Sequence, residues 1–376
     1  MKKFIIQIII FISPFILIFG LPTYILWQSK ENFYKIDNLL KDKEKLLIGY
    51  AYNENNYGNI KWTYLNSNKN KSVWALGSSR VLQFRKNMFD ATFYNAGYTI
   101  SSINDFTPFI KSLPNSKLPK YIIVGLDQWM FNEFYDSLNI KQSTDAWQNS
   151  FTFYPKVFST YKNVYADLFA GKYNISSLNQ HSDSWNKIGL NAKIKNTGFR
   201  NDGSIFYGDQ IMKLINKDTI AGDYNYSDTF GRIERGDSRF QYGKTVNKKA
   251  LAELDRFLKY CKTKHITIIA FLPPFADKVY NKMNESNNYA YLKGIYSSVR
   301  PIFDKYNYEV YDFSKVSSCK SNDNETIDGF HGGESTYQKL LISMLDSGSI
   351  LNKVTNVKRL KIDLMKKKNN YIIYDN

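Results

Sequence analysis

The sequence predicts an α/β fold built on a parallel sheet of about five strands. Short apolar runs alternate with longer amphipathic stretches, and the runs are bounded by glycine or proline, as expected of consecutive β-α-β units. The expected strands cover residues 72–76, 92–94, 121–124, 266–272 and 308–313. With 376 residues, 43% of them hydrophobic, the chain can bury a core of this size.

Amphipathic stretches join these strands. Apolar side chains from Ala250 to Cys261 recur three or four positions apart, which predicts a helix over residues 247–264 that leads into the fourth strand. Residues 101–113 and 335–345 are expected to form further helices, the second of which closes the domain. Parallel neighbours need such crossovers, so the alternation favours a parallel sheet.

The segment between the third and fourth strands is too long for a simple crossover. It is rich in Tyr, Phe, Asn and Ser, and we interpret about residues 130–245 as an insertion. Loops at the carboxyl ends of parallel strands form the ligand crevice, so we expect the insertion to cap the site. The other expected divisions are a juxtamembrane stalk at 31–71, the main domain at 72–350 and a peripheral basic tail at 351–376.

The first 30 residues predict one N-terminal transmembrane helix. Residues 4–29 carry no charged side chain and would form about 39 Å of helix, against a hydrocarbon core of roughly 30 Å. No small-x-small cleavage site follows, which favours a retained anchor over a signal peptide. Lys2 and Lys3 suit the cytoplasmic side, while Tyr24 and Trp27 suit the far interface. We expect a single-pass protein of the cytoplasmic membrane with its body on the extracytoplasmic side.

The net charge narrows the classes of partner. Lys and Arg number 51 and Asp and Glu 34, which gives +17 and favours anionic partners such as phospholipid headgroups or acidic envelope polymers. The alternative is a solvated basic surface without a specific ligand. No helix-turn-helix, zinc-finger or RNP-like pattern occurs, so nucleic acid is not an expected partner.

Cysteine and histidine are sparse. Cys261 and Cys319 form no CxxC pair, and either one bridge or two separate buried thiols fits the sequence. The three histidines lie far apart without metal-binding spacing, so we expect no metal or other cofactor.

Three residues form a candidate catalytic triad. Ser79 follows the first strand and opens a segment that could be helical. At such a position backbone N–H groups favour a nucleophile that faces an oxyanion. Taken alone, Ser79 could equally be a helix cap. A serine nucleophile needs a base oriented by a carboxylate. Asp328 and His331 lie three apart in a glycine-containing turn before the closing helix, and a solvated turn with an exposed histidine is the alternative.

Four short blocks carry a resemblance to a known family. They are Gly-Ser-Ser-Arg at 77–80, Asn-Ala-Gly at 95–97, Gly-Leu-Asp-Gln at 125–128 and Asp-Gly-Phe-His at 328–331. In order and spacing they resemble blocks one, two, three and five of the SGNH/GDSL hydrolases. The chain is most similar to the cell-envelope branch, which includes the teichoic-acid D-alanine transfer protein and the alginate and peptidoglycan O-acetylation proteins. The resemblance implies a flavodoxin-like three-layer sandwich.

The resemblance also implies residue roles. Ser79 would be the nucleophile, His331 the general base and Asp328 its orienting carboxylate, and the Ser79 and Gly97 amides would form part of the oxyanion hole.

The third block departs from the family pattern. The family's asparagine donor is replaced by Asp127, followed by Gln128. Because an ionised Asp127 would repel an oxyanion, several alternatives are open. Gln128, Asn132 or another donor substitutes, Asp127 is neutral or turned away, or the site is weakened.

Two arginines are candidates for binding an anionic substrate. Arg80 stands where the common hydrolase motif has leucine, and it either binds substrate or pairs with a carboxylate. Arg200 lies with Asp202 in a glycine-bounded turn at 198–203, and it either faces the crevice or belongs to a salt-bridged turn.

These features predict a membrane-anchored serine acyltransferase that O-acylates a cell-surface polysaccharide, with acetyl as the expected group, through an acyl-Ser79 intermediate. The polysaccharide would be the acceptor, and a membrane-bound O-acyltransferase is the candidate partner that supplies the acyl group. Two alternatives are an anchored esterase acting on glycan or lipid esters, and a non-catalytic envelope binding or scaffold protein.

Overall fold

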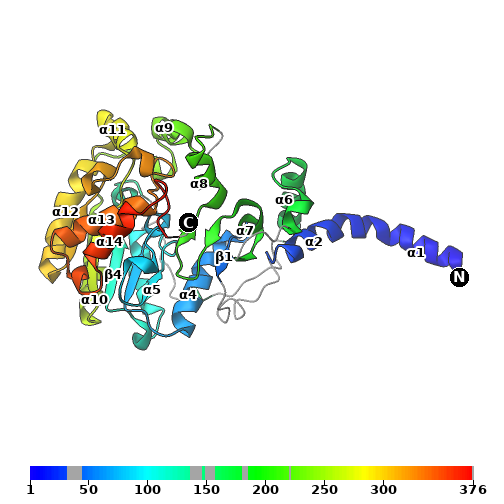
Figure 1. Ribbon diagram of the computed structural model, residues 1–376, viewed down its shortest axis with the longest axis horizontal. Helices are drawn as coiled ribbons and strands as arrows, with labels where there is room; N and C mark the ends of the chain where they lie inside the picture. The colour runs from blue at the N-terminus through cyan, green and yellow to red at the C-terminus, as the bar shows by residue number, and fades with distance from the viewer. Residues whose placement is uncertain (32–44, 136–145, 149–156, 180–184, 220–221, 375–376) are drawn as a thin grey trace. The chain divides into compact units, whose positions relative to one another are not determined.

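The chain folds into two compact units. The computed structural model describes residues 1–31, 45–135, 146–148, 157–179, 185–219 and 222–374 (Figure 1). Unit 1 comprises Met1–Tyr57, Ser150–Asn201 and Ile205–Asp209, and unit 2 comprises Gly58–Asn149, Asp202–Ser204 and Gln210–Asn376.

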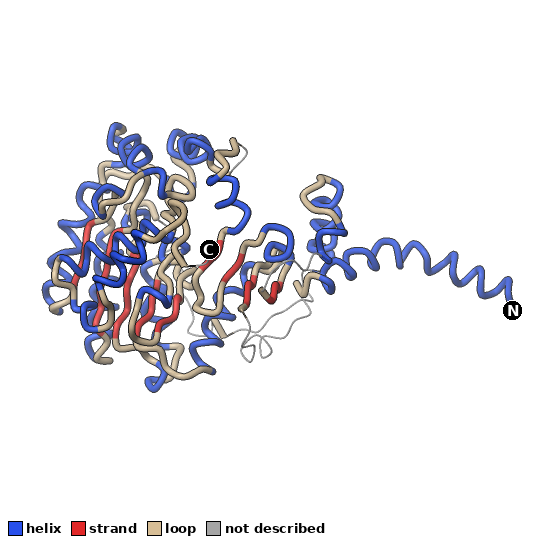
Figure 2. Tube along the Cα trace, in the orientation of Figure 1, coloured by secondary structure: helices blue, strands red, loops and turns tan. Residues whose placement is uncertain are grey.

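Unit 2 contains a five-stranded parallel sheet, which confirms the predicted α/β fold (Figure 2). Its strands are β2 (Val73–Leu76), β3 (Phe93–Asn95), β4 (Tyr121–Gly125), β8 (Thr267–Leu272) and β9 (Glu309–Asp312). The order across the sheet is β3-β2-β4-β8-β9. Counted along the chain this is 2-1-3-4-5, so the chain reverses its direction of growth between β2 and β4, where open α/β sheets bind ligands.

Helices cover both faces of this sheet. Because side chains alternate along a strand, Trp74 and Leu76 join one hydrophobic cluster while Val73 and Ala75 join the other. The first face is covered by α5 (Phe106–Lys111), α10 (Lys248–Thr263) and α12 (Leu292–Tyr306), and the second by α13 (Glu334–Asp346) and α14 (Val357–Met365). Unit 2 therefore has three layers.

The two cysteines lie in different clusters. Cys261 belongs to the cluster on the first face and Cys319 to the cluster on the second. Both thiols are free and fully buried, so of the two alternatives the structure has separate buried thiols.

The predicted peripheral tail is wrong for most of its length. Leu360 of α14 is fully buried against α13, and Ile372 and Ile373 are buried as well. The Glu334 N–H, at the start of α13, donates to the Tyr371 carbonyl at 2.8 Å. The many lysines of this segment obscure a helix with one apolar stripe, and residues 351–374 pack onto unit 2 through Leu360, Ile372 and Ile373 while most of the other side chains stay exposed or part-buried.

Unit 1 contains a small sheet that the sequence does not predict. Its order is β5-β1-β6-β7, with β1 (Leu46–Ile48), β5 (Asn186–Ile188), β6 (Gly198–Phe199) and β7 (Ile205–Phe206). The first of these strands comes from the expected stalk and the other three from the expected insertion, so the predicted boundaries at 31–71 and 130–245 do not match the observed units. Of the stalk, residues 32–44 lie outside the described part.

Three helical segments open unit 1: α1 (Lys2–Phe15), the π-helical turn η1 (Ile16–Gly20) and α2 (Leu21–Gln28). Within the described residues no one helix has both the length and the apolar composition to cross a bilayer, but Lys2–Phe15 and Ile18–Gln28, bent by 44°, have them as a pair. The bend lies at the π-helical turn just after Pro14, and both features bend helices. The predicted helix over residues 4–29 is therefore divided by a bend.

Further helices occur in both units. They are α4 (Tyr57–Ser67), α6 (Val157–Phe169), α7 (Leu190–Lys195), α8 (Gly208–Ile215), α9 (Ser227–Arg235) and α11 (Asp277–Glu285).

Candidate active site

Ser79 lies where β2 ends, beside the reversal point of the sheet. It begins a single 3-10 turn, η3 (Ser79–Val81), and the longer helix expected after it does not form. The Ser78 hydroxyl accepts the Arg80 N–H at 3.2 Å and caps this turn. A Cβ on Gly125 would lie 2.5 Å from Val81 Cγ1, so glycine at the end of β4 lets the turn pack onto the strand ends.

The three predicted triad side chains are in hydrogen-bond contact. Ser79 Oγ lies 2.9 Å from His331 Nε2, and His331 Nδ1 lies 2.7 Å from Asp328 Oδ2. The His331 and Asp328 side chains are 13% and 18% exposed, so the imidazole is reachable from solvent. This is the arrangement of a serine, a base and an orienting carboxylate.

The loop that carries Asp328 and His331 is held by its own hydrogen bonds. Asp328 Oδ1 accepts the N–H groups of Phe330 and His331 at 2.9 and 2.7 Å. Burial alone would raise the pKa of Asp328, but the adjacent imidazole and these donors outweigh burial, so the pKa lies below its ordinary value. Asp328 is therefore ionised at neutral pH and can fix the tautomer of His331.

Part of the predicted insertion lies against this loop. Asp223 Oδ2 accepts the Gly329 N–H at 3.1 Å, and the Arg232 guanidinium lies 5.6 Å from the centroid of the Phe330 ring. The Phe240 ring, in the 3-10 turn η12 (Ser238–Phe240), lies 5.9 Å from the Phe330 ring.

Arg80 is not placed to bind substrate. Its side chain is fully buried, and its Nε, Nη1 and Nη2 donate to Phe330 O at 3.0 Å, Gln128 Oε1 at 2.7 Å and Pro273 O at 2.7 Å. Nη1 also lies 3.5 Å from Asp127 Oδ1. Of the two alternatives for Arg80, pairing with a carboxylate is the observed one, and substrate binding is the wrong one because every side of the guanidinium faces protein.

Most of the predicted oxyanion donors are engaged elsewhere. The Gly97 N–H donates to Asn95 Oδ1 at 2.9 Å, the Gln128 amide to Pro273 O at 2.8 Å, and the Asn132 amide to Gln241 O at 2.7 Å. Gln128 and Asn132 are therefore corrected to structural roles. The Ser79 N–H is the first of its turn and has no acceptor within it.

Asp127 is completely buried beside the triad. The Arg80 Nη1 lies 3.5 Å from its Oδ1. Burial raises the pKa of Asp127, and the Arg80 charge and the Ser78 side chain offset this only in part. The carboxyl group is therefore a weaker acid than an exposed aspartate, and its nearest cation is Arg80.

Arg200 is held within unit 1. Its Nη1 donates to Ile205 O at 2.7 Å, and its guanidinium lies 4.8 Å from the centroid of the Phe206 ring. Only 5% of Arg200 is exposed, so the structure gives it a part in the β6–β7 hairpin rather than the predicted substrate contact.

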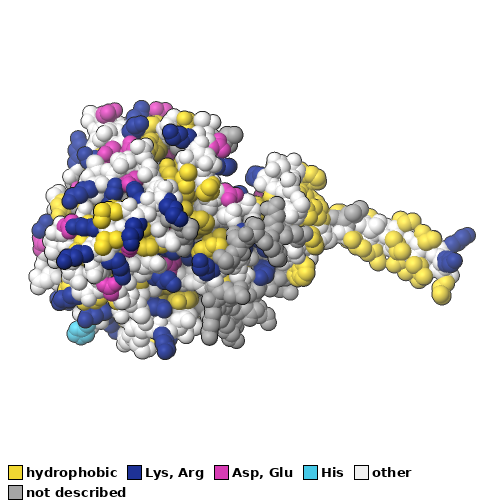
Figure 3. Space-filling model, in the orientation of Figure 1, with side chains coloured by type: hydrophobic (Ala, Val, Ile, Leu, Met, Phe, Trp, Pro, Cys, Tyr) yellow, Lys and Arg dark blue, Asp and Glu magenta, His cyan; other side chains and the backbone are white. Residues whose placement is uncertain are grey.

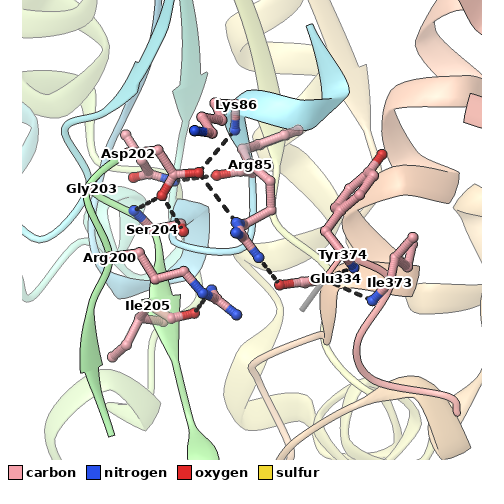
Figure 4. A network of polar contacts seen from close by, with 12 residues as sticks. Arg85, Lys86, Arg200, Asp202, Gly203, Ser204, Ile205, Glu334, Ile373 and Tyr374 are labelled. Atoms are coloured by element: carbon pink, nitrogen blue, oxygen red, sulfur yellow. Dashed lines mark hydrogen bonds and ion pairs between the residues drawn. The ribbon is translucent and has the colours of Figure 1, made fainter. Parts of the chain in front are cut away.

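A buried ionic network that the sequence does not reveal supports the end of the triad loop. Figure 4 shows Arg85 between two carboxylates, with Nε 3.2 Å from Asp202 Oδ2 and Nη1 2.5 Å from Glu334 Oε1. The other Glu334 oxygen accepts the N–H groups of Ile373 and Tyr374 at 2.9 and 3.3 Å. Since Glu334 lies three residues after His331, this network fixes the start of α13. Asp202 thus belongs to a salt-bridged turn.

Sequence reasoning also missed an aromatic and cationic side of the site. The Trp129 ring is near two guanidinium groups, with Arg80 5.3 Å and Arg239 5.0 Å from its centroid. Arg239 is exposed, unlike Arg80. No local pattern marks Arg239, because its partner ring lies on a distant segment.

The arrangement can carry out nucleophilic acyl chemistry. A serine hydroxyl, an imidazole and a carboxylate joined by two hydrogen bonds are the groups that this chemistry requires. Among the described residues no group of three or more His, Cys, Asp or Glu side chains is placed to hold a metal ion.

We predict that Asp127 gives the protein a distinctive pH dependence of stability. A carboxyl group whose pKa is raised on folding stabilises the native state below its ordinary pKa of 3.8, and this contribution is lost as the pH rises through the folded-state pKa. The free energy of unfolding of Asp127→Asn relative to wild type should therefore increase from pH 4 to pH 7 in urea titrations. Asp346→Asn, which alters an exposed carboxylate, is the control, and parallel curves for Asp127→Asn would contradict the prediction.

Removing Arg85 should destabilise unit 2 strongly. Arg85→Met leaves two buried carboxylates without their cation, a change that costs about 3–5 kcal/mol of unfolding free energy. Arg300→Met removes an exposed i,i+4 pair with Asp304 and should cost about 0–1 kcal/mol. Urea unfolding of both variants measures the difference, and equal losses would show that the buried network contributes no more than a surface pair.

Comparison of the chain with models of known families and with curated proteins found no match. The resemblance to SGNH/GDSL proteins therefore depends on the four short blocks and on the geometry in which their residues meet.

Proposed function

We propose that the chain is a serine acyl-transferring enzyme of the SGNH/GDSL type that acylates a surface polysaccharide. The observation that carries the proposal is the contact of Ser79 with His331 at 2.9 Å and of His331 with Asp328 at 2.7 Å. These residues are far apart in the sequence yet meet at the carboxyl end of a parallel sheet. The strand order 2-1-3-4-5 is that of flavodoxin-like sheets and supports the SGNH assignment.

The geometry supports a two-step reaction. Ser79 Oγ attacks the acyl carbonyl carbon of the donor while His331 Nε2 accepts its proton. The bond from the acyl carbon to the donor then breaks, His331 returns the proton to the leaving group, and an acyl ester remains on Ser79. A hydroxyl of the polysaccharide attacks this ester, His331 takes the hydroxyl proton and passes it to Ser79 Oγ, and the acylated acceptor leaves. Asp328 stabilises the imidazolium in both steps.

We assign the Ser79 N–H to the developing charge, because it is the first N–H of its turn and has no acceptor within the turn. An ionised Asp127 would oppose this charge, and its pairing with the Arg80 cation reduces that opposition.

The location is part of the proposal. The bent pair Lys2–Phe15 and Ile18–Gln28 has the length and apolar composition of a membrane anchor. An anchored enzyme of this chemistry, facing the outside of the cytoplasmic membrane, would receive its acyl group from a membrane-bound O-acyltransferase and deliver it to an envelope polysaccharide. Arg239, exposed beside Trp129, suits an acceptor that carries negative charge.

An esterase is the second candidate. The partial exposure of His331 and Asp328 lets water reach the position from which the acceptor hydroxyl would attack. Water and sugar hydroxyls resolve the same acyl-serine, so the triad by itself favours neither outcome.

Covalent labelling tests the nucleophile. A fluorescent fluorophosphonate should label the wild-type chain and Ser297→Ala, which alters an exposed serine of α12. Ser79→Ala should lose the label completely because no oxygen remains for His331 to activate, and His331→Ala should lose most of it. Gel fluorescence with circular dichroism of each folded variant measures this. Labelling that survives in Ser79→Ala would remove the proposed nucleophile, and an unlabelled wild type would favour the non-catalytic alternative.

An acceptor experiment separates transfer from hydrolysis. With 4-nitrophenyl acetate as donor, de-O-acetylated envelope polysaccharide should accelerate release of 4-nitrophenol and become acetylated, because sugar hydroxyls resolve the acyl-serine faster than water does. Mass spectrometry of the polysaccharide and absorbance of 4-nitrophenol are the two measurements, with Ser79→Ala as the blank. Release that is independent of the polysaccharide and leaves it unmodified would favour the esterase.

A further inference from the structure

The first helix of unit 1 is exposed along its length. No residue of α1 is buried, and its Ile and Phe side chains from Phe4 to Phe15 are 40% to 73% exposed. Figure 3 shows hydrophobic side chains along this helix. A continuous apolar surface of this length is unfavourable in water, and contact with lipid would remove it from water.

A second helix, α6, packs along the end of this apolar segment. The Tyr165 hydroxyl donates to Ile18 O at 3.0 Å, and the Tyr161 and Thr23 hydroxyls lie 2.6 Å apart. The Phe158 ring lies 6.4 Å from the Phe19 ring in an edge-on arrangement. These contacts fix α6 beside residues 18–23 of the N-terminal helices.

The position of these contacts along the helices determines how deep they would lie in a bilayer. Tyr24 and Trp27 are 40% and 61% exposed, and such side chains prefer the headgroup level of a bilayer. Phe19 precedes them by five and eight residues, which is roughly 8–12 Å along a helix. If Tyr24 and Trp27 lie at the headgroups, Phe19 and the Phe158 ring beside it lie at the level of the acyl chains.

The outward face of α6 has the composition of an interfacial helix. Phe158, Lys162, Tyr165 and Phe169 are spaced four, three and four residues apart and so share one face. Phe158 and Phe169 are 78% and 82% exposed, and the Tyr165 and Phe169 rings stack with centroids 5.9 Å apart. The opposite face packs inward through the fully buried Val164, whose cluster includes Ile25 and Leu26. Exposed aromatic rings with a lysine able to reach the headgroups are typical of helices that lie in a membrane surface.

We propose that α6 lies in the interface of the lipid bilayer beside the N-terminal helices and makes a second membrane contact for unit 1. Lipid is the occupant because the exposed apolar surface of α1 continues through Phe19 onto Phe158. An open apolar groove of about 550 Å³ between Phe15 and Trp27 lies on the same helices and can take an acyl chain. With two membrane contacts, the N-terminal helices and α6, unit 1 keeps one orientation to the bilayer.

Depth-dependent quenching tests this in the full-length protein. Cys261 and Cys319 are both fully buried, so a single introduced cysteine can be labelled selectively with bimane. The test positions are Phe158→Cys and Phe169→Cys, with Lys162→Cys as a shallower one. Asn55→Cys, exposed in η2 (Glu54–Asn56) of the same unit, is the matched control. Each variant is reconstituted in vesicles of phosphatidylethanolamine and phosphatidylglycerol.

Doxyl-labelled lipid should quench bimane at positions 158 and 169 severalfold more than at position 55, and aqueous iodide should show the reverse order. Quenching by iodide at 158 and 169 equal to that at 55 would overturn the proposal. Protection from both quenchers would also overturn it, because a protein surface, such as a second copy of the chain, would then cover α6. Repeating the series with Ser79→Ala should change nothing, so the result is independent of the proposed acyl chemistry.

Discussion

The structure around the candidate triad depends on one buried cation. The Arg80 guanidinium contacts the segments that follow β4 and β8 and the Phe330 carbonyl, which directly precedes His331. A guanidinium presents donors in a fixed planar fork, so three acceptors in one plane define where three chain segments must lie. Because Arg80 is joined to Ser79 by one peptide bond, the position of the nucleophile and the position of its base are set by the same group.

This constraint explains why Asp127 and Gln128 follow β4. A buried arginine without a counter-charge would be costly, and Asp127 and Gln128 supply the negative charge and an amide oxygen to it. Arg80 and Asp127 are therefore best understood as one pair, because each charge stabilises the other in a buried setting. The segment that resembles the third block lies at the end of β4. Its side chains contact Arg80, so the proposed reaction has fewer free oxyanion donors.

Sequence patterns predict those features whose residues lie close together along the chain. The five strands of unit 2 are visible in the sequence because each is a local apolar run with its own boundaries, and the triad is visible because Asp328 and His331 share one turn. The strands of unit 1 are two or three residues long and draw on segments more than a hundred residues apart, so no local pattern marks them. The same holds for Arg85, whose partners Asp202 and Glu334 lie 117 and 249 residues away along the chain. The acceptors of the Gln128 and Asn132 amides likewise come from other segments, so the sequence could not show that these candidate donors are engaged elsewhere.

Two arginines five residues apart bind the triad loop on either side of His331. Arg80 holds the Phe330 carbonyl just before His331, and Arg85 holds the Glu334 carboxylate just after it. The Tyr337 hydroxyl adds a third link by donating to the Arg80 carbonyl. Buried charge-assisted hydrogen bonds of this kind resist displacement, because breaking one leaves an unpaired charge in a low dielectric. The distance from Ser79 to His331 is therefore set by contacts that take no part in the proposed acyl chemistry. An acylated Ser79 would therefore leave His331 in place to activate the next hydroxyl, which is the requirement that a two-step transfer puts on its base.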